Sequence, residues 1–191
     1  MISVRWLLVC LCLAPSFVFA ASPQEEFWQA LRRLCGQAFA GRMVEGTAAS
    51  DAAFKGERMV MHVRQCGENE IRIPFHVGEN RSRTWVIVRT PTGLRLTHDH
   101  RHEDGSEDAV TRYGGETKDG GTAAVQEFHA DEFTATLIPA ARTNIWTMRI
   151  EGDRTFTYAL RREKENRRFA VEFDLTQPIA VPPAPWGHEQ K

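Results

Sequence analysis

Hydrophobic and polar residues alternate along most of the chain, in short runs that are separated by turn residues. Such alternation is typical of β-strands that have one face in a core and the other in water. The clearest run, residues 70–77, has an apolar residue at every second position, and its Pro74 points to an edge or a bulge. We predict strands at residues 38–45, 57–66, 70–77, 84–90, 94–102, 123–129, 132–138, 144–150, 155–162 and 168–175.

One segment near the N-terminus, residues 22–36, has helical spacing instead. Ser22 is a typical N-cap, Pro23 suits the first helical position, and Glu25 can close a capping box. Gly36 is a typical helix end. Apolar residues recur between them on one helical face, namely Phe27, Trp28, Leu31, Leu34 and Cys35. We predict a short amphipathic helix that packs against the strands.

The strands follow one another closely, with tight turns and no alternating helices. This order excludes a parallel sheet, which needs a helix between successive strands. We predict an all-β fold, in which an antiparallel up-and-down meander of about ten strands closes as a barrel and leaves no long edge exposed. One domain covers residues 21–176 in this interpretation, and a proline-rich, extended tail follows at residues 177–191.

Residues 1–20 have the features of a secretory signal peptide. Arg5 supplies a positive charge, residues 7–13 are apolar, and small residues precede a cleavage position between Ala20 and Ala21. The alternative, a membrane anchor, needs a longer apolar run, and no second run follows. We therefore expect a periplasmic or secreted protein that is not an integral membrane protein after cleavage.

Two cysteines follow this segment, Cys35 and Cys66. In an oxidising compartment they are expected to form one disulfide, and a pair of free thiols is the alternative. The charges nearly balance, with 24 basic and 25 acidic side chains in the whole chain, which argues against nucleic acid as a partner. The basic run at residues 161–168 alternates in sign, as is typical of a solvated hairpin tip.

The densest candidate chemistry lies in one histidine-rich strand and the turn after it. His98, His100 and His102 occupy every second position and continue the row of Leu94 and Leu96. Because alternate residues of a strand share a face, the three histidines are expected to face the core. Acidic residues follow at positions 103, 104, 107 and 108. Three interpretations are open: a metal or ligand site, a buried polar network with these acids, and an exposed strand end.

A metal site is geometrically possible for two of these histidines. Same-face neighbours on a strand lie about 7 Å apart, so His100 and His102 can share one ion, with Glu107 as the predicted third ligand. Imidazole and carboxylate ligands suit zinc, iron, copper or nickel, so the expected cofactor is a divalent transition metal. Other candidates for a ligand from a neighbouring strand are His62, His76 and His129.

Three segments resemble parts of known protein families. The segments IRIPFHVGENRSRTW and LRLTHDHRHEDGSEDAVTRYGG resemble a family of small, uncharacterised secreted proteins of Gram-negative bacteria, over nearly all of the mature chain. This resemblance implies secretion and assigns no catalytic residues. The segment LCGQAFAG at residues 34–41 resembles the start of calycin barrels such as the lipocalins, although Phe39 stands near the position of their usual tryptophan. That resemblance implies the barrel architecture of ligand carriers.

Part of the histidine-rich strand is similar to the first metal motif of the cupins. His100 and His102 are followed by Glu107 after four residues and by Gly114 after six more. The leading glycine, Gly93, is one residue too far away, and the second cupin motif is absent from the sequence. The resemblance implies a metal-dependent enzyme with His100, His102 and Glu107 as metal ligands.

We predict a non-enzymatic binding protein for a small ligand or a metal. The alternatives are the metal-dependent, cupin-like enzyme and a structural envelope protein without a small-molecule site. No catalytic residue is assigned, because neither Ser82 nor Ser106 has the glycine pattern of a nucleophile elbow. For an organic ligand the predicted contacts are His98, His100, His102, Glu107 and Tyr113.

Overall fold

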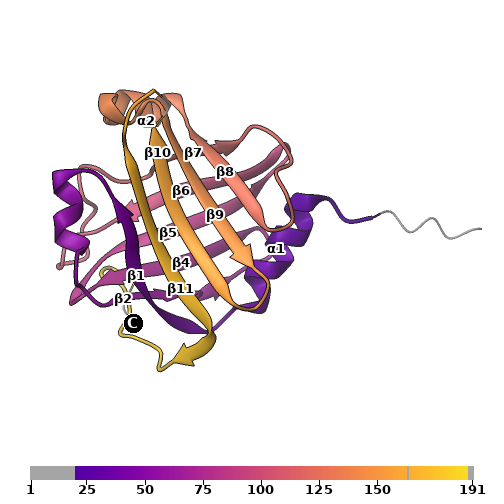
Figure 1. Ribbon diagram of the computed structural model, residues 1–191, viewed down its shortest axis with the longest axis horizontal. Helices are drawn as coiled ribbons and strands as arrows, with labels where there is room; N and C mark the ends of the chain where they lie inside the picture. The colour runs from indigo at the N-terminus through magenta and orange to yellow at the C-terminus, as the bar shows by residue number, and fades with distance from the viewer. Residues whose placement is uncertain (1–19, 163, 189–191) are drawn as a thin grey trace, which may run out of the picture.

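The computed structural model of the chain describes residues 20–162 and 164–188. These residues form a closed, antiparallel β-barrel with few helices (Figure 1). The predicted all-β, up-and-down barrel is therefore confirmed. Residues 1–19 of the predicted signal peptide lie outside the described residues. None of the described helices is long and apolar enough to cross a membrane.

Eleven strands form within the described residues. They are β1 (Ala38–Gly46), β2 (Met59–His62), β3 (Gln65–Cys66), β4 (Glu70–Val77), β5 (Asn80–Thr90), β6 (Gly93–His100), β7 (Tyr113–Thr117), β8 (Val125–Ala130), β9 (Asn144–Glu151), β10 (Thr155–Arg162) and β11 (Arg168–Ile179). The helical elements of the same residues are α1 (Pro23–Arg33), η1 (Ala49–Phe54), α2 (Glu132–Leu137) and η2 (Pro139–Ala141).

The strands follow the chain order around the barrel. Each strand from β4 to β10 pairs in antiparallel fashion with the next one along the chain. β11 then pairs with β1, β1 with β2, and β2 with β4, which closes the ring. The two-residue β3 pairs with the other end of β4, so ten strands form the ring itself. Closure pairs the backbone N–H and C=O groups that an open sheet would leave without partners at its edges.

The closure between β1 and β11 depends on Gly41. This residue lies opposite Phe173, next to an irregularity in the register. A Cβ atom at Gly41 would overlap the Phe173 ring and come within 2.5 Å of the Glu172 carbonyl oxygen. Glycine is therefore required here, because any side chain would push β1 away from β11.

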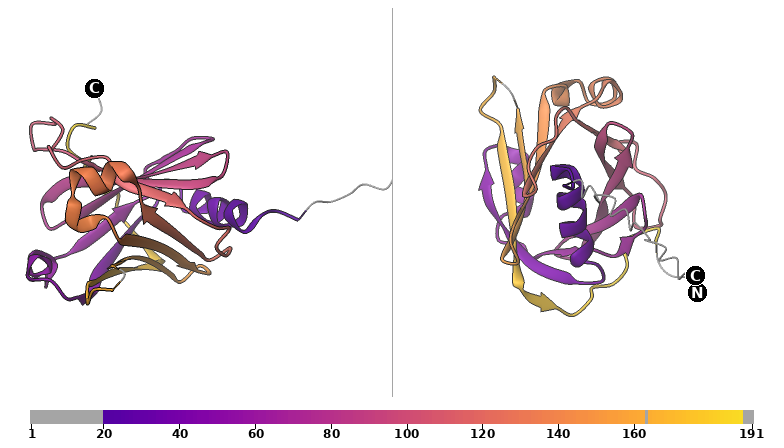
Figure 2. Two further views of the ribbon diagram at one scale, coloured as in Figure 1. Left: turned by 90° about the horizontal axis from the view of Figure 1, so that it is seen from above. Right: turned by 90° about the vertical axis from the view of Figure 1, so that its right-hand side faces the viewer.

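Helix α1 lies across one end of the barrel (Figure 2). It begins as predicted, with the Ser22 hydroxyl oxygen accepting a hydrogen bond from the Glu25 amide at 3.1 Å. The Glu25 carboxylate pairs with Arg89 on β5 rather than with the N-cap amide, so it ties the helix to the barrel. Phe27 and Trp28 are fully buried. Burying side chains of this size contributes about 1.5–3 kcal/mol each.

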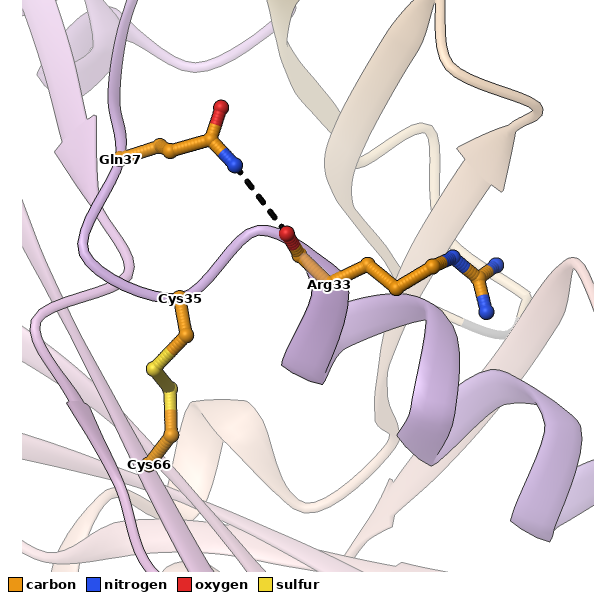
Figure 3. Close-up of a disulfide and its surroundings, with 4 residues drawn as sticks. All are labelled: Arg33, Cys35, Gln37 and Cys66. Atoms are coloured by element: carbon orange, nitrogen blue, oxygen red, sulfur yellow. Dashed lines mark hydrogen bonds between the residues drawn. A yellow bond between two sulfur atoms is a disulfide. The ribbon is translucent and has the colours of Figure 1, made fainter.

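The predicted disulfide between Cys35 and Cys66 is confirmed (Figure 3). It joins the segment after α1 to β3, across 31 positions of the chain and with 6.3 Å between the two Cα atoms. Beside it, the Gln37 side-chain amide donates a hydrogen bond to the Arg33 carbonyl oxygen at 3.1 Å (Figure 3). Both links hold the end of α1 against the barrel.

Two predicted strands differ from the structure. The predicted strand at residues 57–66 is divided into β2 and β3, with a break at residues 63–64. Residues 132–138, expected to be a strand, contain helix α2 instead. The reason is local capping, because the Asp131 carboxylate accepts a hydrogen bond from the Thr134 amide at 2.8 Å. The Thr134 hydroxyl also donates to the Gly114 carbonyl oxygen at 2.7 Å, which attaches α2 to β7.

The C-terminal segment is tied to the outside of the barrel. β11 continues to Ile179, so it includes the first residues of the predicted tail. The chain then returns over the outer side, where the Trp186 amide donates to the Arg81 carbonyl oxygen at 3.2 Å. Farther on, Nε2 of His188 lies 3.1 Å from a carboxylate oxygen of Asp99 on β6. These contacts hold the described part of the tail against β5 and β6.

Candidate functional site

The inward rows of β5 and β6 change from apolar to polar along the barrel. Leu96 of β6 is buried in the apolar core, and His98 and His100 follow on the same face. On β5, Trp85 lies directly opposite His98, and Arg83 lies directly opposite His100. Because opposed residues of an antiparallel pair share a face, these four side chains form one inward patch. The polar end of the patch is the one farther from α1.

A cavity of about 230 Å³ lies against this patch, and its lining includes residues of η1 and of the α2–η2 segment. These elements lie at the end of the barrel away from α1 (Figures 1 and 2). Part of its wall consists of aromatic rings, those of Phe54, Phe75, Trp85, Trp146 and Phe169. Another part consists of uncharged polar side chains, those of His98, His100, Tyr113, Asn144 and Tyr158. Apolar surface with a few oriented polar groups is typical of small-molecule sites. We call this space the mouth cavity.

The proton position on His98 follows from its hydrogen bonds. Nδ1 of His98 lies 3.0 Å from the carbonyl oxygen of Tyr113, which can only accept, so Nδ1 donates. Burial lowers the pKa of His98 to about 3, so the ring is neutral and its Nε2 carries no hydrogen. Nε2 therefore accepts the hydroxyl hydrogen of Tyr158, at 2.6 Å. Burial raises the pKa of Tyr158 well above its usual range, which keeps this hydrogen in place.

His100 and Tyr113 form a second polar contact, nearer the opening. Nε2 of His100 lies 3.2 Å from the Tyr113 hydroxyl oxygen. Burial and the nearby charge of Arg83 lower the pKa of His100 to about 4, and burial raises the pKa of Tyr113 to about 12. The Tyr113 ring also stacks on His98, with 4.5 Å between the ring centroids. Near neutral pH the side chains of His98, His100 and Tyr113 are therefore uncharged. Together they can donate and accept hydrogen bonds.

Three arginines surround the mouth cavity, Arg83, Arg162 and Arg167. Arg167 donates two hydrogen bonds to the buried carboxylate of Asp51, at 2.6 and 2.8 Å. Arg162 donates to the Asn144 side-chain oxygen at 2.8 Å and lies 3.4 Å from the carboxylate of Glu165. These two arginines therefore have acidic partners.

Arg83 differs from the other two arginines. Its Nη1 donates to the side-chain oxygens of Asn80 and Ser82, at 3.1 and 3.3 Å, and its guanidinium lies 5.3 Å from the centroid of the Phe54 ring. Within residues 20–162 and 164–188, no carboxylate forms an ion pair with it. Burial lowers the pKa of Arg83, although a guanidinium stays protonated in proteins.

The structure brings three of the five predicted ligand residues together, His98, His100 and Tyr113. The other two, His102 and Glu107, are exposed in the turn that follows β6 and do not line the mouth cavity. β6 ends at His100, and the Gly105 amide then donates to the His102 carbonyl oxygen at 2.9 Å, which reverses the chain. Glu107 pairs with two arginines of this turn, Arg101 at 3.2 Å and Arg112.

The predicted metal ligands are not gathered at one point. In the part of the chain that the structure describes, no group of three histidine, cysteine, aspartate or glutamate side chains is placed to hold a metal ion. The additional candidates alternate along their strands with the core residues Met61, Phe75 and Phe128, so they lie on the outward side of the barrel. These candidates are His62 on β2, His76 on β4 and His129 on β8.

Sequence reasoning missed Arg83, Tyr158 and the two arginines of the β10–β11 hairpin. Arg83 is detectable in principle, because it lies two residues before the inward Trp85 on the same strand, but the predicted strand begins at residue 84 whereas β5 begins at Asn80. The alternating charges of residues 161–168 predict a solvated tip, whereas Arg162 and Arg167 line the mouth cavity. Tyr158 meets His98 only because the barrel closes.

Comparisons with known proteins add no functional assignment to this geometry. No protein-family model matches the chain. No curated protein matches it significantly either.

Proposed function

We propose that this protein binds a small organic molecule in the mouth cavity and does not catalyse a reaction on it. The observation that carries the proposal is the cavity of about 230 Å³, in which aromatic rings face neutral histidine and tyrosine side chains. Sites for small organic molecules combine apolar walls with a few fixed hydrogen-bonding groups in this way. The calycin-like barrel architecture agrees with the role of a carrier.

The polar groups of the mouth cavity favour binding over catalysis. Both ring nitrogens of His98 are engaged, one with the Tyr113 carbonyl and one with the Tyr158 hydroxyl. No serine, cysteine or lysine lines the cavity within the described chain. A nucleophile with an adjacent free base is the usual basis of covalent catalysis, and these residues do not provide that pair.

The competing hypothesis of a metal site requires a rearrangement. His102 and Glu107 lie beyond the end of β6, and Glu107 pairs with Arg101 and Arg112. Bringing them to His100 would break these ion pairs and the turn that contains them. Elemental analysis of protein purified without chelator tests this hypothesis directly, since a metal site predicts about one ion per chain.

We also propose that the protein acts in the periplasm or outside the cell, after removal of residues 1–20. The Cys35–Cys66 disulfide supports this proposal, because disulfides persist in oxidising compartments. Mass spectrometry of protein recovered from the periplasm of a Gram-negative host is expected to find a chain that begins at Ala21. A chain that retains residues 1–20 contradicts the proposal.

Indole is a suitable probe of the mouth cavity, because it is neutral, aromatic and small. We expect saturable changes in the ¹H–¹⁵N spectrum at the indole NH groups of Trp85 and Trp146, which line the cavity. Leu160→Trp fills the cavity from β10 and is expected to abolish these changes. Val44→Trp adds the same side chain at a position that is 48% exposed and serves as the matched control.

Two results contradict the proposal. If indole leaves the NH signals of both Trp85 and Trp146 unchanged, the mouth cavity does not accept this ligand. Equal binding to Leu160→Trp and Val44→Trp shows that indole binds elsewhere.

A further inference from the structure

Arg83 has hydrogen-bond donors available to a ligand. Its Nη1 is used by Asn80 and Ser82, while Nε and Nη2 have no hydrogen-bond partner among the residues described. The Phe54 ring, 5.3 Å from the guanidinium, supports the side chain from one side. The guanidinium is a planar fork that matches the two oxygens of a carboxylate. Arg83 therefore offers a positive charge and two free donors at the wall of the mouth cavity.

The surroundings of Arg83 leave its charge uncompensated. Asp51 is the one acidic residue among the described cavity-lining residues, and both its oxygens are held by Arg167. His100, directly opposite Arg83, is neutral near pH 7 because its pKa is about 4. An anion that enters the mouth cavity meets an unpaired cation and no free carboxylate.

The volume and the walls of the mouth cavity limit the size and the chemistry of the part of the ligand that does not contact Arg83. A cavity of about 150 Å³ is enough to hold benzene in another protein. A volume of about 230 Å³ accommodates one aromatic ring with a short side arm. The rings of Phe54 and Phe169 provide apolar surface against which such a ring can pack. Trp85 can offer only its edge, because Phe75 and Tyr158 stack on it at 4.7 and 4.4 Å between centroids.

We infer that the ligand is a small aromatic carboxylate, whose carboxylate binds Arg83 and whose ring packs against the aromatic side chains that line the mouth cavity. This inference rests on the proposed function and specifies the ligand class for the same cavity. The His100 ring and the Tyr113 hydroxyl, on the strands beside Arg83, are available as further hydrogen-bonding groups.

Three probes of similar shape separate the contribution of the ligand's charge to the affinity from the contribution of its ring. Isothermal titration calorimetry at pH 7 compares phenylacetate, phenylacetamide and phenethylamine, which are an anion, a neutral molecule and a cation. We expect phenylacetate to bind about tenfold to a hundredfold more tightly than phenylacetamide, as a charge-assisted hydrogen bond to arginine predicts. Phenethylamine, which brings a second positive charge beside Arg83, is expected to bind most weakly.

Variants of Arg83 assign the preference to this residue. Arg83→Met is expected to remove the preference for phenylacetate over phenylacetamide and to leave the affinity for phenylacetamide nearly unchanged. Continued binding of phenylacetamide shows that the variant has kept its cavity. Arg83→Lys retains the charge without the fork and is expected to give an intermediate preference. Arg42→Met is the control, because Arg42 on β1 has a side chain that is 78% exposed and lies outside the cavity.

Different results would overturn the aromatic carboxylate as ligand and the proposed function. Equal affinity for phenylacetate and phenylacetamide overturns the inference and leaves the proposed function standing. A preference that survives in Arg83→Met, or that Arg42→Met also removes, overturns the role of Arg83. If neither phenylacetate nor phenylacetamide binds, the inference is overturned, and the indole experiment then decides whether the proposed function is overturned as well.

Discussion

The Tyr158 hydroxyl donates a hydrogen bond to Nε2 of His98, with 2.6 Å between the two atoms. β6 and β10, which carry these residues, are not neighbours in the sheet, so the bond crosses the inside of the barrel. The other ring nitrogen of His98 is bonded to the Tyr113 carbonyl at 3.0 Å. His98 therefore connects three strands at the wall of the mouth cavity.

Removal of this bond is expected to lower stability. Tyr158→Phe deletes the donor and leaves Nε2 of His98 buried without a partner. We expect the free energy of unfolding to fall by about 1–3 kcal/mol, the usual cost of a buried unsatisfied group. Urea denaturation at pH 7 measures this change. In a His98→Phe background the acceptor is absent, so Tyr158→Phe should cost much less, and an equal cost in both backgrounds contradicts the assignment.

The buried histidines predict a loss of stability in mild acid. Burial lowers the pKa of His98 to about 3 and those of His76 and His100 to about 4. In the unfolded chain each histidine titrates near about 6.5. Between these values the unfolded state binds more protons than the folded state, so stability is complete above about pH 6.5 and declines as the pH falls. Each histidine contributes at most about 1.4 kcal/mol per pH unit.

Urea denaturation at pH 7, 6 and 5 tests this pH dependence. The free energy of unfolding is expected to decrease at each step. His98→Gln removes one titrating group. The free energy of unfolding of this variant should therefore fall less steeply with decreasing pH, by the contribution of about one proton. A stability that stays constant between pH 7 and pH 5 contradicts neutral, buried histidines.

The disulfide is expected to stabilise the barrel at the end covered by α1. Changing both cysteines, in Cys35→Ser/Cys66→Ser, should lower the free energy of unfolding by about 2–5 kcal/mol, as for other native disulfides. Thermal denaturation with and without a reducing agent provides the control. The reducing agent should lower the Tm of the wild-type protein and leave the Tm of the double variant unchanged. Equal sensitivity of both proteins would mean that the effect does not come from this bond.

Gly41 provides a test of the barrel closure. Gly41→Ala places a Cβ atom against the Phe173 ring and the Glu172 carbonyl, and the overpacking is expected to cost about 1–3 kcal/mol. Gly120→Ala is the matched control, because a Cβ atom at Gly120 meets nothing within 4 Å. Chemical denaturation of both variants measures the difference. Equal stabilities would indicate that β1 and β11 are not in close contact at this point.

The fold was predictable because its signals are local. Alternating residues mark strands wherever a strand has one buried and one solvated face, as in much of β9 and β10. Ser22 and Pro23 likewise mark the start of α1 within one helical turn. The segment of α2 was misassigned because its apolar residues fit either period, and the Asp131 cap decided the outcome.

The candidate site was only partly predictable, because much of it depends on contacts between distant strands. The alternation on β6 correctly grouped His98 with His100. It also included His102, because alternation does not reveal where a strand ends, and here the turn at Gly105 ends the inward row. The meeting of Tyr158 with His98 follows from the closed ring of strands, which no short stretch of sequence specifies.

Locating the bound molecule tests most directly whether a small aromatic carboxylate binds in the mouth cavity. Intermolecular nuclear Overhauser effects between phenylacetate and isotope-labelled protein report which side chains surround the phenyl ring. We predict contacts from the ring protons to the cavity-lining side chains of Phe54, Phe169 and Trp85, with loss of these contacts in Leu160→Trp. Contacts confined to residues outside the mouth cavity, or no contacts at saturating phenylacetate, would contradict the claim.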